Sequence, residues 1–239
     1  MRIVGIDTST FTGGIALLDN GQIVAEHNAY VTRKNSEGLM GVLHRMLHDL
    51  DWNAKDIEGI SVAIGPGSFT GIRIGVTMAK VLGYSLNIPI GRVVTLDVIA
   101  ANISFSKSLI CPLICARRDI VYNAVYRGNG LHPKKVVDYN VGEIEKVIDS
   151  IKSTGDINNG VYDKIIFLGN GAIQHKGTIE KNLEGLATFG YPWHLGPRPG
   201  VVAVLGEYQI KKGNVVGAHE LTPFYMGRSS AENLRKSNA

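Results

Sequence analysis

The stretch GPGSFTGIR, residues 65–73, decides how the chain folds, because it joins an apolar run to a long helical segment. The run from Ile60 to Ile64 is expected to form a buried strand, and the helix that follows is expected to end before Pro89. Glycines at such a junction let backbone N–H groups approach an anion, whereas Ser68 or Thr70 can simply cap the helix. The stretch lacks the lysine of a Walker loop. At this point the stretch can be either a phosphate-binding loop or a turn that packs against another part of the protein.

The helix that follows this turn has almost no polar face. From Gly71 to Asn87 only Arg73 and Lys80 are charged. Small residues recur at every fourth position along one side, namely Gly71, Gly75, Ala79 and Gly83. A helix that is apolar nearly all round is buried on more than one side, and a ridge of small residues lets a second helix approach closely. We therefore favour packing over phosphate binding, against a helix of this chain or of a partner.

The order of predicted elements occurs twice. In each half, three strands, a helix and a fourth strand precede a Gly-X-Gly turn and another helix. The first helix is expected to start at residues 35–37, and the helix after the second turn is expected to run unbroken over residues 172–183. The turns Gly65-Pro66-Gly67 and Gly169-Asn170-Gly171 lie 104 residues apart. This period predicts an architectural duplication.

The duplication predicts an α/β protein of two lobes, each a mixed sheet with helices, and a cleft between them. We expect the N-terminal lobe to span residues 1–108 and the C-terminal lobe residues 109–228. A closing helix with Pro199 in its first turn is expected within the second lobe. Residues 229–239 are polar and are expected to form a flexible tail.

Composition excludes several classes of protein. The 239 residues are 44% hydrophobic and 19% charged, which argues against disorder. The net charge of +4 is compatible with RNA but is not a basic footprint by itself. We expect no export signal, because the first apolar run is broken at Asp7, and no membrane span. Cys111 and Cys115 are expected to be unpaired thiols in a reducing compartment.

A few residues are candidates for chemistry, and each has a structural alternative. Nine residues could belong to a nucleotide or phosphate site: Asp7, Thr8, Ser9, Thr10, Gly65, Gly67, Ser68, Gly169 and Gly171. The same residues can satisfy turn amides and cap helices. His44 and His48 have a spacing that can grip a metal, but no third ligand accompanies them, so a solvated or interfacial pair is favoured.

Five segments together resemble the TsaB (YeaZ) family. They are IVGIDTST (3–10), GGIAL (13–17), GPGSFTGIRIGVTMAK (65–80), CARRDIVYNAVY (115–126) and LTPFYMGRSSAE (221–232). The resemblance covers nearly the whole chain, and GPGSFTGIR is its most specific part. It implies the fold of the actin-like ATPase superfamily, which includes the sugar kinases. It also implies a cytoplasmic role in forming threonylcarbamoyladenosine in tRNA, as the non-catalytic partner of the transferase TsaD together with the ATPase TsaE.

The resemblance also implies where the partner binds. In this family the first two long helices contact TsaD, or a second copy of TsaB when TsaD is absent. The residues expected at that interface are Leu39, Met40, Leu43, Met46, Leu47, Gly71, Ile72, Gly75, Val76, Ala79 and Gly83. The resemblance implies no cofactor of the chain's own, although ATP or ADP can sit at the partner junction. Contact with tRNA is expected to be indirect.

Two departures bear on whether the chain is an enzyme. TsaD-like proteins carry a His-x-x-x-His metal motif after the long helix, and the matching segment GRVVTLDVIAANI (91–103) contains no histidine. Where the family commonly has an aspartate before Ala-Arg-Arg, this chain has Cys115. The resemblance therefore implies a homologue without transferase activity. An ATP-dependent small-molecule kinase remains an alternative, and a glycoprotease-like hydrolase is the least favoured one.

Overall fold

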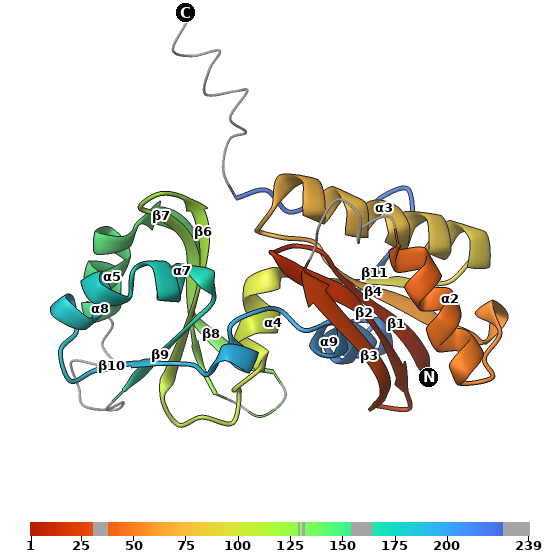
Figure 1. Cartoon of the computed structure of the whole chain (residues 1–239), viewed down its shortest axis with the longest axis horizontal. Helices are drawn as coiled ribbons and strands as arrows, with labels where there is room; N and C mark the ends of the chain where they lie inside the picture. Colours follow the sequence, from red (N-terminus) through yellow and green to blue (C-terminus); the bar gives the residue numbers. More distant parts are fainter. Residues whose placement is uncertain (31–37, 129, 131, 154–163, 227–239) are drawn as a thin grey trace, which may run out of the picture.

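The computed structural model describes residues 1–30, 38–128, 130, 132–153 and 164–226, which form two α/β lobes (Figure 1). One lobe holds a six-stranded sheet in the order β11-β5-β4-β1-β2-β3, and the other a five-stranded sheet in the order β10-β9-β6-β7-β8. Both sheets mix parallel and antiparallel pairs. The predicted two-lobed α/β class is therefore confirmed. The predicted tail, residues 229–239, lies outside the described residues.

The first sheet begins with the predicted hairpin. Its strands are β1 (Arg2–Asp7), β2 (Thr12–Asp19), β3 (Gln22–Tyr30), β4 (Gly59–Ala63), β5 (Ile90–Val93) and β11 (Val215–Val216). Strand β1 pairs antiparallel with β2 and parallel with β4. Asn20 and Gly21 turn the β2–β3 hairpin with φ of 50° and 84°, the left-handed values that a tight two-residue turn requires.

Helices cover both faces of the first sheet. Helices α2 (Leu39–Asp49) and α3 (Phe69–Leu86) share a core with Val4 and Ile6, whereas Ile3 packs with α9 (Pro199–Lys211) on the other face. Successive strand residues point to opposite faces, so β1 is buried on both sides. The short helix η1 (Ala54–Asp56) precedes β4. The predicted helix start at residues 35–37 lies outside the described residues.

The second sheet repeats the plan of the first. Its strands are β6 (Leu109–Arg117), β7 (Ile120–Arg127), β8 (Lys134–Glu143), β9 (Ile165–Leu168) and β10 (Ala187–Phe189), with helices α5 (Ile144–Lys152), α7 (Asn170–Gln174) and α8 (Lys176–Asn182). Strand β6 pairs antiparallel with β7 and parallel with β9, as β1 does with β2 and β4. The prediction of one helix over residues 172–183 is wrong, because the chain breaks at His175 into α7 and α8.

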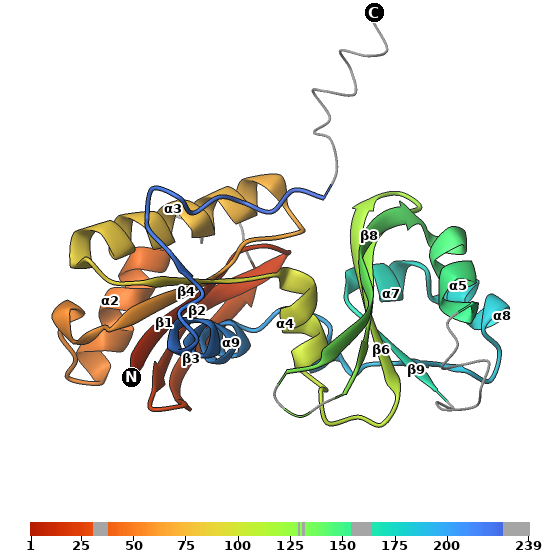
Figure 2. The ribbon, with the colours of Figure 1, turned by 180° about the vertical axis from the view of Figure 1, so that it is seen from behind.

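Two helices cross the predicted lobe boundary at residues 108 and 109. Helix α4 (Thr95–Ala101), assigned by the prediction to the first lobe, packs against β6 and β7 of the second sheet. Helix α9, assigned to the second lobe, packs against β1, β2, β4 and β5 (Figure 2), and β11 then joins the first sheet. The boundary therefore needs correction. Each half gives its last helix to the other half, a long-range exchange that local periodicity does not reveal.

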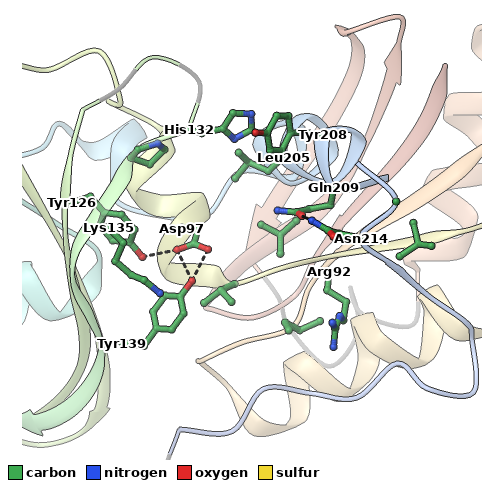
Figure 3. Close-up of a pocket in the computed structure, with 16 residues that line it drawn as sticks. Arg92, Asp97, Tyr126, His132, Lys135, Tyr139, Leu205, Tyr208, Gln209 and Asn214 are labelled. Carbon is green, nitrogen blue, oxygen red and sulfur yellow. Dashed lines mark hydrogen bonds between the residues drawn. The ribbon is translucent and has the colours of Figure 1, made fainter. Parts of the chain in front are cut away.

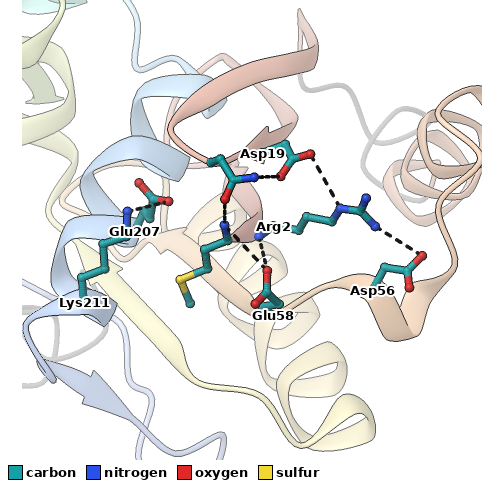
Figure 4. Close-up of polar contacts among 8 residues, drawn as sticks. Arg2, Asp19, Asp56, Glu58, Glu207 and Lys211 are labelled. Atoms are coloured by element: carbon teal, nitrogen blue, oxygen red, sulfur yellow. Dashed lines mark hydrogen bonds and ion pairs between the residues drawn. The ribbon is translucent and has the colours of Figure 1, made fainter.

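The N-terminus is tied to this first lobe by polar contacts (Figure 4). The guanidinium of Arg2 lies 3.8 Å from Asp19 and 3.5 Å from Asp56, and the backbone N–H of Arg2 donates to Glu58 at 2.7 Å. The same guanidinium lies 4.4 Å from the ring centroid of Trp52. These contacts join β1, β2 and the η1 segment at one end of the sheet. None of the described helices combines the length and apolar character that a membrane span needs.

Candidate functional site

The first strand ends in a turn whose polar side chains are buried and bonded within the chain. Asp7, Thr8 and Ser9 are almost inaccessible to solvent. Asp7 Oδ1 accepts from the Ser9 backbone N–H at 3.2 Å and from the Ser9 hydroxyl at 2.6 Å, while Thr8 Oγ1 donates to the Gly71 carbonyl at 2.6 Å. Burial raises the pKa of Asp7 to about 7, although its bonds with Ser9 act in the opposite direction.

The glycine turn after β4 packs directly on this first turn. A Cβ at Gly67 would overlap the carbonyl oxygen of Ser9, so only glycine permits the approach. The backbone N–H of Ser68 donates to the same Ser9 carbonyl at 2.7 Å. The Ser68 hydroxyl accepts from the Gly71 N–H at 3.2 Å and caps α3. The turn therefore packs on the chain's own first hairpin, whereas the packing interpretation expected a second helix against α3.

The glycine turn of the second half uses the same packing with different side chains. Gly169 has a φ of +89°, and a Cβ there would overlap the carbonyl oxygen of Leu113 on β6. The backbone N–H of Cys115 donates to the Asn170 side chain at 3.0 Å, and its thiol donates to Gln174 at 3.1 Å. Burial raises the pKa of the Cys115 thiol. The side chain that the second lobe places at the position of Asp7 in the first lobe is therefore a thiol whose pKa is raised.

Several polar groups of the first turn are already bonded within the chain. The Ser68 and Gly71 amides already have acceptors within the chain, and the Thr10 hydroxyl donates to the Thr12 carbonyl at 2.9 Å. Asp7 Oδ2 has no hydrogen-bond partner among the described residues, yet it is shielded from solvent and cannot meet a phosphate-bound metal. The carboxylate that the small-molecule kinase alternative would use at this turn is buried.

The histidines and cysteines considered as metal ligands do not form a metal site among the described residues. Within residues 1–30, 38–128, 130, 132–153 and 164–226, no group of three or more His, Cys, Asp or Glu side chains could hold a metal ion. His44 and His48 are exposed on α2, where His48 lies 3.5 Å from Asp49. Cys111 and Cys115 are free thiols, and burial strongly raises the pKa of Cys111.

The predicted ridge of small residues on α3 faces the protein's own sheet, which corrects the expectation that a partner helix covers it. A Cβ at Gly75 would lie 2.5 Å from Thr8 Oγ1, and one at Gly83 would lie 2.7 Å from Ile90 Cδ1. Nine of the residues expected at the interface are buried in the first lobe: Leu39, Leu43, Leu47, Gly71, Ile72, Gly75, Val76, Ala79 and Gly83. The close approach that small residues permit is used by β1 and β5.

Other side chains of these two helices point outward. On α2, Met40 is 49% exposed, and Met46 is half-buried against the core. On α3, Val81 is 55% and Tyr84 70% exposed. Sequence reasoning named Met40 and Met46 but missed Val81 and Tyr84, because it took the small-residue ridge for the outer face. Apolar side chains exposed on helices that cover one face of a sheet are candidates for an interaction surface.

One side of α3 is covered by residues 217–226, the last residues that the structure describes, and we call this segment the C-terminal strap (Figure 2). Leu221 of the strap is fully buried in the first core. The Tyr225 ring lies 5.4 Å from that of Phe69, and its hydroxyl accepts from Arg73 Nε at 3.1 Å. Sequence reasoning gave this segment no structural role, since it has no helical or strand periodicity.

A pocket of about 760 Å³ lies between the lobes, lined by residues from β5, α4, β7, β8 and α9 (Figure 3). At its second-lobe side Asp97 accepts hydrogen bonds from the hydroxyls of Tyr126 (2.6 Å) and Tyr139 (2.7 Å to Oδ2). Burial raises the pKa of Asp97, while both tyrosine bonds lower it. Sequence reasoning predicted a cleft between the lobes but not these lining residues, because they come from segments far apart in the chain.

The chain is similar in sequence to proteins of tRNA modification. The family model of TsaD, described as tRNA N6-adenosine threonylcarbamoyltransferase, matches residues 25–231. The tRNA threonylcarbamoyladenosine biosynthesis protein TsaB of Bacillus subtilis (strain 168) is 38% identical over 233 residues, which cover 97% of this chain and 96% of that protein. Identity at this level over nearly the full length of both proteins indicates common ancestry.

The fold is similar to those of two solved structures. YeaZ from Pseudomonas aeruginosa has a TM-score of 0.77 and 21% identity, covering 94% of this chain and 99% of that one. The activator of the 2-hydroxyisocaproyl-CoA dehydratase from Clostridium difficile, with bound ADPNP, has a TM-score of 0.50 and 12% identity, covering 94% of this chain and 100% of that one. At such identities the likeness concerns the fold, which is the expected actin-like ATPase class.

Proposed function

Since this chain belongs to the TsaB (YeaZ) family, within the wider TsaD domain family, we propose that it is the non-catalytic subunit that docks on a TsaD-like transferase and activates it. The reaction served is the formation of threonylcarbamoyladenosine in tRNA. A partner role without catalysis is supported by the first turn, where Asp7 and its neighbours bond to one another and are closed to solvent. The Cys115 turn likewise brings no carboxylate.

The observation that carries the docking proposal is the outward apolar surface of α2 and α3. Met40, Val81 and Tyr84 are each about half exposed or more, and both helices cover the same face of the first sheet. Exposed apolar side chains cost free energy in water unless a partner covers them. A standard interface buries about 800 Å² on each side, which two helices of this length can supply.

The remaining partners are inferred from the family. We infer that a second copy of the chain covers α2 and α3 when the transferase is absent, so that homodimer and heterodimer compete. A TsaE-like ATPase joins the complex through the same assembly, and tRNA is contacted by way of the transferase. Any ATP or ADP at the junction would be held mainly by the partner, because Asp7 is buried and the Ser9 and Ser68 amides already donate within the chain.

The test is a binding measurement with variants of the outer surface. Val81→Asp and Met40→Asp place a carboxylate on α3 and α2 without touching the buried core. Each is expected to weaken binding to a purified TsaD-like protein at least tenfold in titration calorimetry, because the charge must be desolvated at the interface. Loss of tRNA modification in the reconstituted system should follow.

Ile173→Asp is the matched control, since Ile173 is 58% exposed on α7 of the second lobe. It introduces the same charge far from the proposed surface and should leave binding unchanged. All three variants should keep the melting temperature of the parent. Wild-type affinity in both the Val81 and Met40 variants would reject α2 and α3 as the docking surface.

A further inference from the structure

Two histidine side chains on the exposed side of α2 take no part in the packing of the first lobe. His44 and His48 are four residues apart in this helix, so their side chains are neighbours on one side of it. Both are exposed, and His44 has no hydrogen bond or ion pair with any residue that the structure describes. The pair lies on a different helix from residues 91–103, the segment that matches the metal motif of TsaD-like proteins. Two imidazoles at this spacing can hold one transition-metal ion.

The surroundings of His48 favour the tautomer that a metal ligand needs. Its Nδ1 atom lies 3.5 Å from Asp49 Oδ1. A carboxylate next to Nδ1 holds the proton on that nitrogen and leaves the lone pair of Nε2 free for a metal ion. Arg45 is the only Lys or Arg residue in α2, and Asp49 is the only Asp or Glu residue. The formal charges of the helix therefore balance, and no excess positive charge on it repels a cation.

One chain supplies only two of the four ligands that zinc binds in a structural site, where the geometry is almost always tetrahedral. Among the residues that the structure describes, no third His, Cys, Asp or Glu side chain joins the pair to form a group that could hold a metal ion. Gly41, one turn before His44, has nothing within 4 Å of its Cβ position, so this side of α2 is open. The remaining ligands must come from solvent or from another molecule.

A second copy of the chain can complete the site. Met40, His44 and His48 follow one another at intervals of four residues and form a row along α2, which lies beside α3 on the outside of the first lobe (Figure 1). Met40 belongs to the surface proposed above to meet a second copy. Twofold symmetry places the same surface of each copy against the other. Two α2 helices that pack through this row bring four imidazoles to the twofold axis.

We propose that His44 and His48 of two copies of the chain bind one zinc ion, which holds the two α2 helices together in the homodimer. This inference rests on the homodimer surface of the proposed function. Imidazole nitrogen is a ligand that suits zinc, and four of them form the closed, four-coordinate arrangement of a structural site. Magnesium prefers oxygen ligands in octahedral geometry and does not replace zinc here.

The test is analytical ultracentrifugation of the purified chain with zinc chloride, with magnesium chloride or with EDTA. Zinc is expected to lower the dissociation constant of the dimer at least about tenfold relative to EDTA, because the ion binds only the dimer with four protein ligands. Magnesium should have no effect. Titration calorimetry should show one zinc ion per two chains. Equal dimer affinity in zinc and EDTA, or one zinc ion per chain without a change in the dimer, would overturn the proposal.

Two variants and one control locate the site. His44→Ala and His48→Ala should each remove the effect of zinc on the dimer. Their melting temperatures in EDTA should equal that of the parent, since both side chains are exposed. Arg45→Ala is the matched control, because it truncates an exposed side chain of the same helix that cannot bind zinc, and it should keep the effect. A zinc effect that survives in both histidine variants would assign the ion to other residues and reject this site.

The same measurements separate this inference from the docking proposal. If Met40→Asp and Val81→Asp weaken binding to the TsaD-like protein but zinc leaves the dimer of the parent chain unchanged, only the zinc site is wrong. If zinc tightens the dimer through His44 and His48 but both aspartate variants bind the TsaD-like protein as the parent does, only the docking proposal is wrong.

Discussion

The two halves of the chain share an architecture and differ in chemistry. Strands β1, β2 and β4 meet with the same directions as β6, β7 and β9, and a glycine turn follows the fourth strand of each half. In the first half the turn packs against Ser9, next to the buried carboxylate of Asp7. In the second half it packs against Leu113, next to the thiol of Cys115.

The comparison shows which features belong to the fold. Gly67 and Gly169 both stand where a Cβ would overlap a carbonyl oxygen of the preceding hairpin. Glycine is required at both positions although the neighbouring hairpin carries Asp7 in the first half and Cys115 in the second. The requirement for glycine is therefore independent of any ligand that these two side chains could bind. The glycines are therefore needed for the close packing of turn on hairpin, while the charge at the hairpin is free to differ.

The first prediction is that the two turns differ in how the free energy of unfolding depends on pH. Burial raises the pKa of Asp7 from its usual 3.8 to about 7, so folding opposes its ionisation. As the pH rises from 4 to 8, the unfolded chain ionises first and the native state loses stability relative to a variant that cannot ionise. Asp7→Asn should therefore gain up to about 4 kcal/mol over the parent across this range in urea unfolding. A difference independent of pH would contradict the buried, protonated carboxyl.

The matched change in the second half is Cys115→Asp. Cys115 is only half-buried, and its neighbours Asn170 and Gln174 can hydrogen-bond a carboxylate. The introduced group should keep an ordinary pKa, so the same pH scan should change its unfolding free energy relative to the parent by less than about 1 kcal/mol. A large effect here would mean that the two turns are electrostatically alike.

The second prediction tests the feature that the halves share. Gly67→Ala and Gly169→Ala should each destabilise the protein by about 3 kcal/mol, because the new methyl group overlaps a backbone carbonyl that cannot move aside. Gly177→Ala in α8 is the control, since nothing lies within 4 Å of its Cβ position. It should gain about 0.5–1 kcal/mol through helix propensity. Tolerance of either turn variant would remove the packing argument from that half.

Sequence reasoning could predict the repeated order of strands, because that order follows from local periodicity. For the segment around Gly67 it favoured packing over phosphate binding, but it expected a helix and not the first hairpin as the packing partner. It also identified two lobes. It assigned the small ridge of α3 to a partner, since a helix that is apolar nearly all round does not reveal which side meets its own sheet. Only the contacts of Gly75 with Thr8, and of Gly83 with Ile90, decide that.

The features that sequence could not predict depend on long-range contacts. Helices α4 and α9 have ordinary amphipathic or apolar patterns, and nothing local tells which sheet each will cover. Helices α4 and α9 both line the pocket between the lobes, so nothing in the sequence signalled that Asp97 would meet Tyr126 and Tyr139 there. The strap likewise depends on the burial of Leu221, one apolar residue in an irregular segment.

The third and smallest prediction concerns this exchange of helices. The Ser61 hydroxyl donates to the Val202 carbonyl at 2.6 Å and joins β4 to α9, whereas the Tyr126 hydroxyl donates to Asp97 at 2.6 Å and joins β7 to α4. Ser61→Ala should cost about 1 kcal/mol, and Tyr126→Phe about 2 kcal/mol because its acceptor is a carboxylate. The measurement is the free energy of unfolding in urea.

The single and double variants together test whether the exchange of α4 and α9 makes the two halves one folding unit. Ser61 and Tyr126 lie in different sheets without shared partners, so their costs should add to within about 0.5 kcal/mol. Helix α4 packs in the core of the second sheet, α9 packs in the core of the first sheet, and the two helices contact each other. We therefore expect that unfolding of one half unfolds the other. Both single variants should therefore shift one common transition, seen alike by far-UV circular dichroism and by tryptophan fluorescence. Two separated transitions, with Ser61→Ala moving one and Tyr126→Phe the other, would mean that each half folds on its own and that the crossing helices join lobes that are already complete.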